Sequence, residues 1–291
     1  MAPENVPQHM KAAQISEPVP TIRPHELLVR IHAAGFCHSD LQTLQGQFKS
    51  PLGMIPSHEP AGVIVQVGAQ ALGSWQVGDR ARDGRLPARR RLCGIHGRRP
   101  GHHGQAARRT VARAGGAADV RGHLGVQFAA ARGFRVVAAD SRAAGRQLAM
   151  EVRDALQPSL VVDSSLPQEA EAQIMQLTDG EGLAAAIVCT DSLPANAWAL
   201  KMLRIGGFLG VLGLPPQDWR FDSSALVFRE LTVRGSYVAS KASTQRMIDL
   251  AESTGVRSHV TTVSFDKIPD IVDMYQTTSM KGRLVVKVVE G

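Results

Sequence analysis

The sequence predicts a two-domain α/β protein, in which a compact β-rich domain precedes a doubly wound parallel sheet. Three observations lead to this fold class. Short apolar stretches punctuated by Gly and Pro fill residues 8–80, which is typical of a small β domain. From residue 122 onward, predicted strands alternate with predicted helices, which favours a parallel sheet covered by helices. Between the two, residues 81–118 sustain a period of neither 2 nor 3.6 residues, and we expect this Arg/Gly/Ala-rich segment to be disordered.

The β-rich domain is expected to cover residues 1–80. A turn marked by prolines leads into its first clear strand, and glycines follow several of its elements. Gly35 is expected to turn the chain toward a short helix whose cap lies near Ser39. The predicted strands cover residues 26–31 and 59–67, and the predicted helix covers residues 39–46.

The second domain is expected to cover residues 119–257, where buried apolar runs alternate with helical patterns. The predicted strands cover residues 134–140, 160–163, 184–189, 207–213 and 231–237. The predicted helices cover residues 124–131, 168–177 and 194–203. A C-terminal tail over residues 258–291 follows and ends in an apolar stretch.

The positive charge of the chain is concentrated in one place. The formal net charge is +7, yet residues 81–121 alone hold eleven arginines, no lysine and two aspartates. No aromatic residues are interleaved with these arginines, which argues against a nucleic-acid-binding surface. Arg, Ala, Gly, His and Pro are what a GC-rich message gives when it is read out of frame, so we hypothesise that this segment is a frameshifted or mis-spliced remnant.

Three cysteines give no disulfide framework, which fits a reducing compartment. No apolar run approaches the roughly 20 residues of a membrane-spanning helix, and the N-terminus lacks the layout of a secretory signal. We therefore expect a cytoplasmic protein without a membrane partner.

Two potential metal ligands each lie close to a carboxylate. Cys37 precedes Asp40 by three residues, and His58 directly precedes Glu59. Thiolate and imidazole suit zinc, and a catalytic zinc site needs three protein ligands and one exchangeable position. A neighbouring carboxylate can orient the imidazole or join the metal. Taken alone, the pair leaves open the alternative that Cys37 is simply a small buried hydrophobic residue.

These residues belong to a series of motifs that resembles a known family. Gly-Phe-Cys-His-Ser-Asp over residues 35–40, His58-Glu59, Ala-Gly-Val-Ile over residues 61–64 and Val-Gly-Asp-Arg over residues 77–80 are similar to the zinc-dependent medium-chain alcohol dehydrogenases. The resemblance implies a GroES-like catalytic domain, a Rossmann NAD-binding domain and a tail that returns to the catalytic domain. It implies hydride transfer between NAD(H) and a small alcohol, aldehyde or ketone, and it allows a homo-oligomer through the Rossmann domain.

The resemblance also assigns catalytic roles. Cys37 and His58 hold zinc, and Ser39 accepts the hydroxyl proton of the substrate. The third zinc ligand of the family is a cysteine in a segment that this chain lacks, so that Glu59 and Cys93 are the candidates here, and we favour Glu59. The family's structural zinc lobe with four cysteines is absent from the sequence.

Asp140 is the candidate contact for the cofactor ribose. It ends a predicted strand eighteen residues after Gly122, close to the offset of about 20 residues seen in dinucleotide-binding units. A carboxylate there repels a 2′-phosphate and favours NAD over NADP. Of the glycine fingerprint only Gly122 and the following histidine remain, which weakens the expectation of dinucleotide binding. By resemblance, the other residues near the cofactor are His38, Leu214, Ser236 and Arg283.

An alternative hypothesis is that the chain descends from this family but has lost its enzymatic activity. In that case the chain is a catalytically impaired or inactive relative with only partial zinc and cofactor sites. The sequence does not identify the substrate pocket either, because each of its candidate residues is of a type more often found in a core; they are Leu44, Phe48, Met54 and Trp75.

Overall fold

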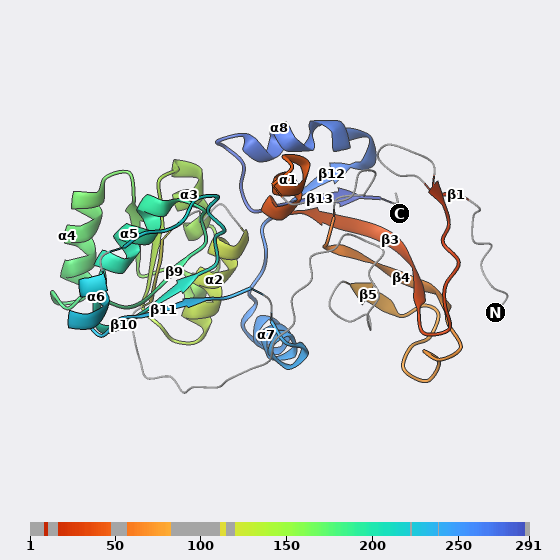
Figure 1. The fold of residues 1–291 in the computed structure, drawn as a ribbon, viewed down its shortest axis with the longest axis horizontal. Helices are drawn as coiled ribbons and strands as arrows, with labels where there is room; N and C mark the ends of the chain where they lie inside the picture. Colours follow the sequence, from red (N-terminus) through yellow and green to blue (C-terminus); the bar gives the residue numbers. More distant parts are fainter. Residues whose placement is uncertain are drawn as a thin grey trace. The chain divides into compact units, whose positions relative to one another are not determined.

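The computed structural model describes residues 9–10, 17–47, 57–82, 111–114, 120–221, 223–237 and 239–288. These residues form two compact units (Figure 1). The first unit takes the described residues up to 82, with Val260–Thr277 and residues 283–288. The second unit takes residues 111–259 and Thr278–Gly282. No helix in the described ranges is long and apolar enough to cross a membrane.

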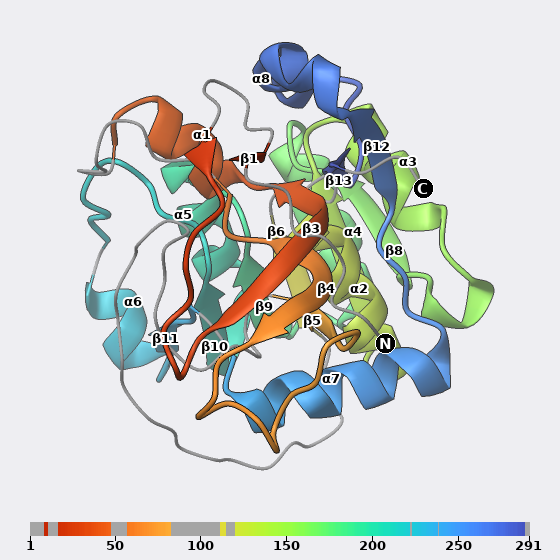
Figure 2. The same cartoon turned by 90° about the vertical axis from the view of Figure 1, so that its right-hand side faces the viewer.

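A five-stranded sheet in the order β12-β13-β3-β4-β5 forms the first unit, and Figure 2 shows β3, β4 and β5 side by side. The C-terminal strand β13 runs antiparallel to β3, with Leu284 opposite Phe36. The end of the described chain therefore completes the sheet in which the N-terminal strands lie. The strands are β3 (Leu27–Phe36), β4 (Pro60–Val67), β5 (Arg80–Arg82), β12 (Val260–Ser264) and β13 (Arg283–Lys287), with a separate short pair, β1 (His9–Met10) and β2 (Glu17–Pro18).

The helix that follows β3 begins earlier than the sequence predicts. Helix α1 spans His38–Leu44 and is capped by Cys37 rather than near Ser39, because the Asp40 carboxylate accepts the Cys37 N–H at 2.8 Å. Gly35 lies inside β3, paired with Val285, and not in a turn. The same unit contains the 3₁₀ helix η2 (Phe265–Asp270) and helix α8 (Ile271–Gln276).

The second unit is built on a six-stranded parallel sheet in the order β11-β10-β9-β6-β7-β8. The chain moves outward from β6 to β8, returns to β9 beside β6, and moves outward again to β11. The direction of winding therefore reverses between β6 and β9, which is the switch point of a doubly wound sheet. The strands are β6 (Val111–Ala114), β7 (Val136–Asp140), β8 (Leu160–Asp163), β9 (Leu183–Val188), β10 (Leu203–Val211) and β11 (Thr232–Gly235).

Strands occupy two parts of the segment for which the sequence predicts disorder. Residues 81–82 belong to β5, and Val111–Ala114 form β6 at the centre of the parallel sheet. The prediction is therefore wrong for these residues. Strand β6 has no apolar pattern of its own, but β7 and β9 supply backbone hydrogen-bond partners on both of its sides. The rest of the predicted segment lies outside the described residues.

Helices cover both faces of the parallel sheet, with α2 and α3 on one face and α4 and α5 on the other (Figure 1). Strand β7 is buried along its whole length, so its alternate residues feed two separate hydrophobic clusters. Helices α3, α6 and α7 are not expected from the sequence, although α3 and α7 have an apolar face as distinct as that of α4. The helices are α2 (Val120–Ala131), α3 (Ala143–Met150), η1 (Asp154–Leu156), α4 (Pro167–Leu177), α5 (Leu193–Lys201), α6 (Ser223–Phe228) and α7 (Lys241–Thr254).

Asn196 on α5 is fully buried, at 0 % exposure. Neither polar atom of its side chain has a hydrogen-bond partner among the described residues. Asn196→Ala is expected to raise the free energy of unfolding by about 1–2 kcal/mol, because an unsatisfied buried amide costs more than the small cavity that alanine leaves. Urea denaturation checks this. Asn196→Asp is the control and is expected to destabilise, since it buries a charge; lower stability of the alanine variant would contradict the prediction.

Candidate metal centre

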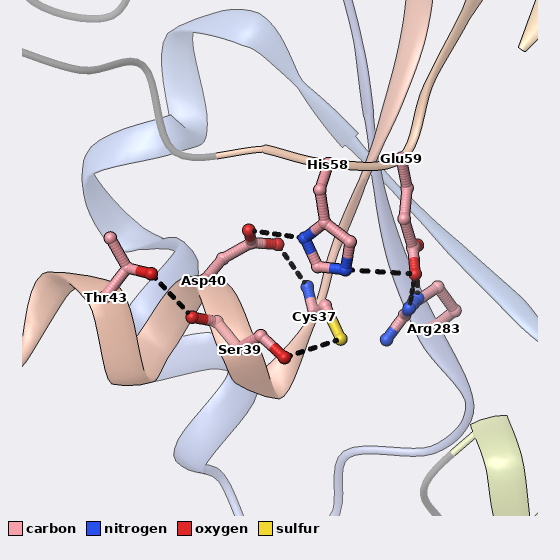
Figure 3. Close-up of polar contacts among 7 residues, drawn as sticks. All are labelled: Cys37, Ser39, Asp40, Thr43, His58, Glu59 and Arg283. Carbon is pink, nitrogen blue, oxygen red and sulfur yellow. Dashed lines mark hydrogen bonds and ion pairs between the residues drawn. The ribbon is translucent and has the colours of Figure 1, made fainter. Parts of the chain in front are cut away.

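The loop between β3 and α1 holds the sulfur of the site. Cys37 follows the last residue of β3 and is buried, and its backbone N–H is bound by the Asp40 carboxylate. The other oxygen of Asp40 accepts a hydrogen bond from Nδ1 of His58 at 3.0 Å. One buried carboxylate therefore fixes both the cysteine loop and the orientation of the imidazole (Figure 3).

Cys37, His58 and Glu59 bring one donor atom each to a common point, and these three atoms lie within 4.8 Å of one another. The donors flank two neighbouring strands. Cys37 directly follows β3, His58 and Glu59 directly precede β4, and β3 pairs with β4. A sulfur, an imidazole nitrogen and a carboxylate oxygen are donors that suit zinc, and three of them leave a fourth position of a tetrahedral ion for an exchangeable ligand. The three atoms are close enough for small side-chain rotations to bring them to one ion. The donor set therefore fits a catalytic zinc site.

Arg283 binds Glu59 with two parallel hydrogen bonds. Its Nε lies 2.9 Å from Oε2, and its Nη2 contacts Oε1 (Figure 3). The arginine lies at the start of β13 and is itself mostly buried, so the pair is held in a partly desolvated position. Gly35 makes room for this arrangement, because a Cβ at that position would collide with the Glu59 carboxylate. The resemblance implies that Arg283 lies near the cofactor; in the structure its hydrogen-bond partner is the carboxylate of Glu59, a candidate metal ligand.

The surroundings shift the pKa values of both nitrogen and sulfur donors. Burial raises the pKa of the Cys37 thiol, but the hydrogen bond to His58 and the charge of Arg283 outweigh it and lower the pKa from 9.0 to about 7. The hydrogen bond to Asp40, aided by the one to Cys37, raises the pKa of His58 from 6.5 to about 10. Without metal, thiolate and imidazolium therefore coexist near neutral pH. Zinc binding needs the neutral imidazole, so metal uptake releases a proton.

In protein freed of metal by a chelator, the alkylation rate of Cys37 by iodoacetamide is expected to rise with pH and to reach half its maximum near pH 7, because the thiolate is the reactive form. His58→Ala removes an interaction that lowers the pKa of Cys37 and leaves burial, which raises it, so the half-maximum moves to higher pH. Mass spectrometry of the Cys37 peptide across a pH series measures this. An unchanged midpoint in the variant would contradict it.

Residues of α1 surround the metal donors. The hydroxyl of Ser39 lies 3.9 Å from the Cys37 sulfur, which brings Ser39 to the edge of the donor group. The His38 ring lies beside Tyr275 of α8, with 6.2 Å between ring centroids, a contact that the sequence does not reveal. Gln42 is buried, whereas Leu44 is exposed. Trp75 is half-buried, and Cys93, Phe48 and Met54 lie outside the described residues.

The remaining predicted cofactor residues belong to the second unit. Asp140 ends β7, Leu214 follows β10 and Ser236 follows β11, so all three lie at the carboxyl edge of the parallel sheet. Gly122 is buried in the first turn of α2. Leu214 and Ser236 are exposed and their backbone N–H groups are bonded to Asp191 and Val211, whereas Asp140 is buried. The structure thus gathers the metal donors in one unit and these four residues in the other.

Two family models match consecutive parts of the chain. The model of the alcohol dehydrogenase GroES-like domain matches residues 23–121, and the model of the zinc-binding dehydrogenase matches residues 122–253. The chain belongs to the zinc-dependent medium-chain alcohol dehydrogenase family. It is therefore related to oxidoreductases along most of its length, and the comparisons do not favour the alternative of an impaired relative.

Individual dehydrogenases of this family are similar over nearly their whole length. Alcohol dehydrogenase 2 of Caenorhabditis elegans is 26% identical over 339 aligned residues, which cover 95% of this chain and 93% of the relative. The alcohol dehydrogenase of Rhizobium meliloti (strain 1021) is 28% identical, covering 92% and 93%. The crystal structure of the alcohol dehydrogenase from Aeropyrum pernix has the same fold, with a TM-score of 0.76 at 20% identity, covering 96% of this chain and 99% of that one.

The alignment with the nematode dehydrogenase is longer than this chain, 339 positions against 291 residues. The relative therefore has internal residues that have no counterpart here. This agrees with the absence from the sequence of the family segment that carries the third cysteine ligand.

Proposed function

We propose that the protein oxidises a small alcohol to the aldehyde or ketone, and catalyses the reverse reduction, with zinc in the site of Cys37, His58 and Glu59 and with NAD as the hydride carrier. The observation that carries this proposal is the meeting of these three donor atoms within 4.8 Å, in a member of the zinc-dependent family. Each donor also has a second partner that holds it in place, namely Ser39, Asp40 or Arg283.

Asp40 prepares His58 for metal binding. It accepts the Nδ1 hydrogen, which leaves the lone pair of Nε2 directed away from Asp40 and toward the other donors. Because the same carboxylate binds the N–H of Cys37, it couples the positions of two ligands. We propose that Asp40 is a positioning residue and does not itself hold the metal.

Glu59 takes the place of the missing third cysteine. A carboxylate bound on both oxygens by Arg283 is held in one orientation, and the guanidinium offsets part of its negative charge. A Cys-His-Glu set carries the same formal charge as a Cys₂His set and keeps one position for substrate. Bound there, zinc supplies Lewis-acid polarisation of the substrate oxygen, so that an alcohol ionises nearer to neutral pH.

Ser39 receives the proton of the substrate hydroxyl. Oxidation of an alcohol to a carbonyl compound releases one proton and one hydride, and a bound nicotinamide cofactor would take up the hydride. The Ser39 hydroxyl lies at the donor cluster and can accept one hydrogen bond while donating another. Gln42 is buried on the same helix and does not titrate near neutral pH, so the relay from Ser39 is short or continues through water.

We assign dinucleotide binding to the carboxyl edge of the parallel sheet. Dinucleotides bind at the switch point of doubly wound sheets, and the switch point here lies between β6 and β9. Asp140 at the end of β7 supports NAD, and Leu214 and Ser236 lie at the same edge. We further propose that residues 1–80 with residues 258–291 form the catalytic domain, that residues 119–257 form the cofactor domain, and that the cofactor domain mediates any homo-oligomer.

Zinc content and NADH formation on one purified sample test the proposal. Elemental analysis is expected to give about one zinc per chain, as for a single site with three protein ligands. A panel of primary and secondary alcohols is expected to give NADH absorbance, and the absorbance change is expected to disappear after treatment with a chelator and to return with added zinc. Folded protein that contains no zinc after growth in zinc-supplemented medium would refute it.

A further inference from the structure

Asp140 and Arg142 form an ion pair at the carboxyl end of β7. The Nε of Arg142 lies 3.6 Å from Oδ1 of Asp140, and the backbone N–H of Arg142 donates to the same oxygen at 2.9 Å. The two side chains differ sharply in exposure, since that of Asp140 is 2% exposed and that of Arg142 is 37% exposed. The charge that this pair presents to an approaching ligand is therefore positive.

The Asp140 carboxylate is packed beneath the start of α3. A Cβ at Gly145 would collide with Oδ2 of Asp140, so glycine is needed there for the carboxylate to be buried. Arg146, one residue further on, donates to the backbone carbonyl of Asp140 at 3.0 Å and forms an ion pair with Asp163 at 2.9 Å. Asp163 is the register partner of Asp140 on β8. Each carboxylate at this corner of the sheet is thus matched by an arginine.

This corner is the place where the adenosine ribose of a dinucleotide is expected. Strand β7 is the neighbour of β6 on the side away from β9, and an acidic group at its end binds the ribose hydroxyls of NAD in doubly wound folds. An exposed carboxylate excludes NADP because it repels the 2′-phosphate. A carboxylate that is buried and paired with a cation loses most of that repulsion, and an arginine fork binds phosphate through two N–H groups.

We propose that Arg142 allows the cofactor site to accept NADP as well as NAD. The guanidinium neutralises Asp140 and offers its exposed N–H groups to the 2′-phosphate, while the unphosphorylated ribose of NAD still fits beside the pair. The inference rests on the dinucleotide binding of the proposed function and extends it, because the acidic residue alone would give NAD specificity.

Calorimetry on the full chain tests this with a matched pair of ligands, ADP-ribose and 2′-phospho-ADP-ribose, which differ only in the 2′-phosphate. The wild-type protein is expected to bind both with affinities within about threefold. Arg142→Gln is expected to weaken 2′-phospho-ADP-ribose by about tenfold or more, the value of a charge-assisted hydrogen bond, and to change ADP-ribose by less than about threefold. Arg135→Gln, which changes the exposed arginine just before the opposite end of β7, is the control and is expected to change neither affinity.

The outcomes separate this inference from the proposed function. Binding of ADP-ribose with rejection of the 2′-phosphorylated ligand by the wild type overturns the inference alone, as does an equal loss of both ligands in a folded Arg142→Gln variant. Failure of the wild type to bind either ligand overturns both the inference and the dinucleotide part of the proposed function. Thermal unfolding of each variant establishes that it is folded, and no turnover measurement is needed.

Discussion

Cys37→Ala is expected to remove zinc from the protein and to abolish alcohol oxidation. The sulfur is one of three donors, and an ion left with only His58 and Glu59 has too few protein ligands to remain bound against dilution or a weak chelator. Zinc per chain is expected to fall to below about a tenth of an ion, against about one in the wild type, because the site then lacks a full ligand set. Elemental analysis after gel filtration, with NADH formation on the same samples, measures both effects.

Cys189→Ala is the matched control for that experiment. Cys189 is also a buried cysteine outside any disulfide, but it lies in the second unit and directly follows β9. Its replacement is expected to leave zinc content and turnover close to the wild-type values. Full zinc occupancy in a folded Cys37→Ala variant would show that Cys37 is not a zinc ligand and would contradict the proposed site.

Asp40→Ala is expected to weaken zinc binding by about 10- to 100-fold, the usual cost of losing a partner that orients a metal ligand. The substitution removes the acceptor of the His58 Nδ1 hydrogen and of the Cys37 N–H at once, so both ligands lose their orientation. Competition with a chromogenic chelator gives the zinc affinity directly. The pKa of His58 is also expected to fall, since the Asp40 hydrogen bond is the main cause of its elevation.

Asp79→Ala is a fair comparison for this variant. Asp79 also accepts a backbone N–H, that of Gln76 at 3.0 Å, and it lies in the same unit but outside the donor cluster. Its loss is expected to lower stability slightly and to leave zinc affinity unchanged. If Asp40→Ala matched Asp79→Ala in zinc affinity, Asp40 would have no role at the metal site.

Much of the parallel sheet follows from local pattern, whereas its centre does not. The strands over residues 136–140 and 160–163 stand out as continuous apolar runs, because both faces of a parallel sheet are buried. Strand β6 lacks such a run, and its pairing with β7 and β9 places it at the centre of the sheet. Sequence patterns report burial along one segment and cannot report partners that other segments supply.

In the candidate metal site, too, some features follow from local sequence and others depend on segments that are distant in the chain. The motifs that contain Cys37 and His58 point to zinc because their residue types and order are specific. The pairing of Glu59 with Arg283 joins residues 224 positions apart, and the sequence around either residue does not predict it. For Asp140, the position at a strand end suggests an open acceptor, and the sequence does not reveal that its carboxylate is buried against Gly145 and paired with Arg142.

The order of synthesis has a consequence for metal loading. Strand β13, which brings Arg283 to Glu59, leaves the ribosome only after the whole parallel-sheet unit has been made. A nascent chain therefore holds Cys37, His58 and Glu59 without the guanidinium that fixes the carboxylate. The group that fixes the third donor of the proposed zinc site therefore takes its place only after all three donors and the whole second unit have been synthesised.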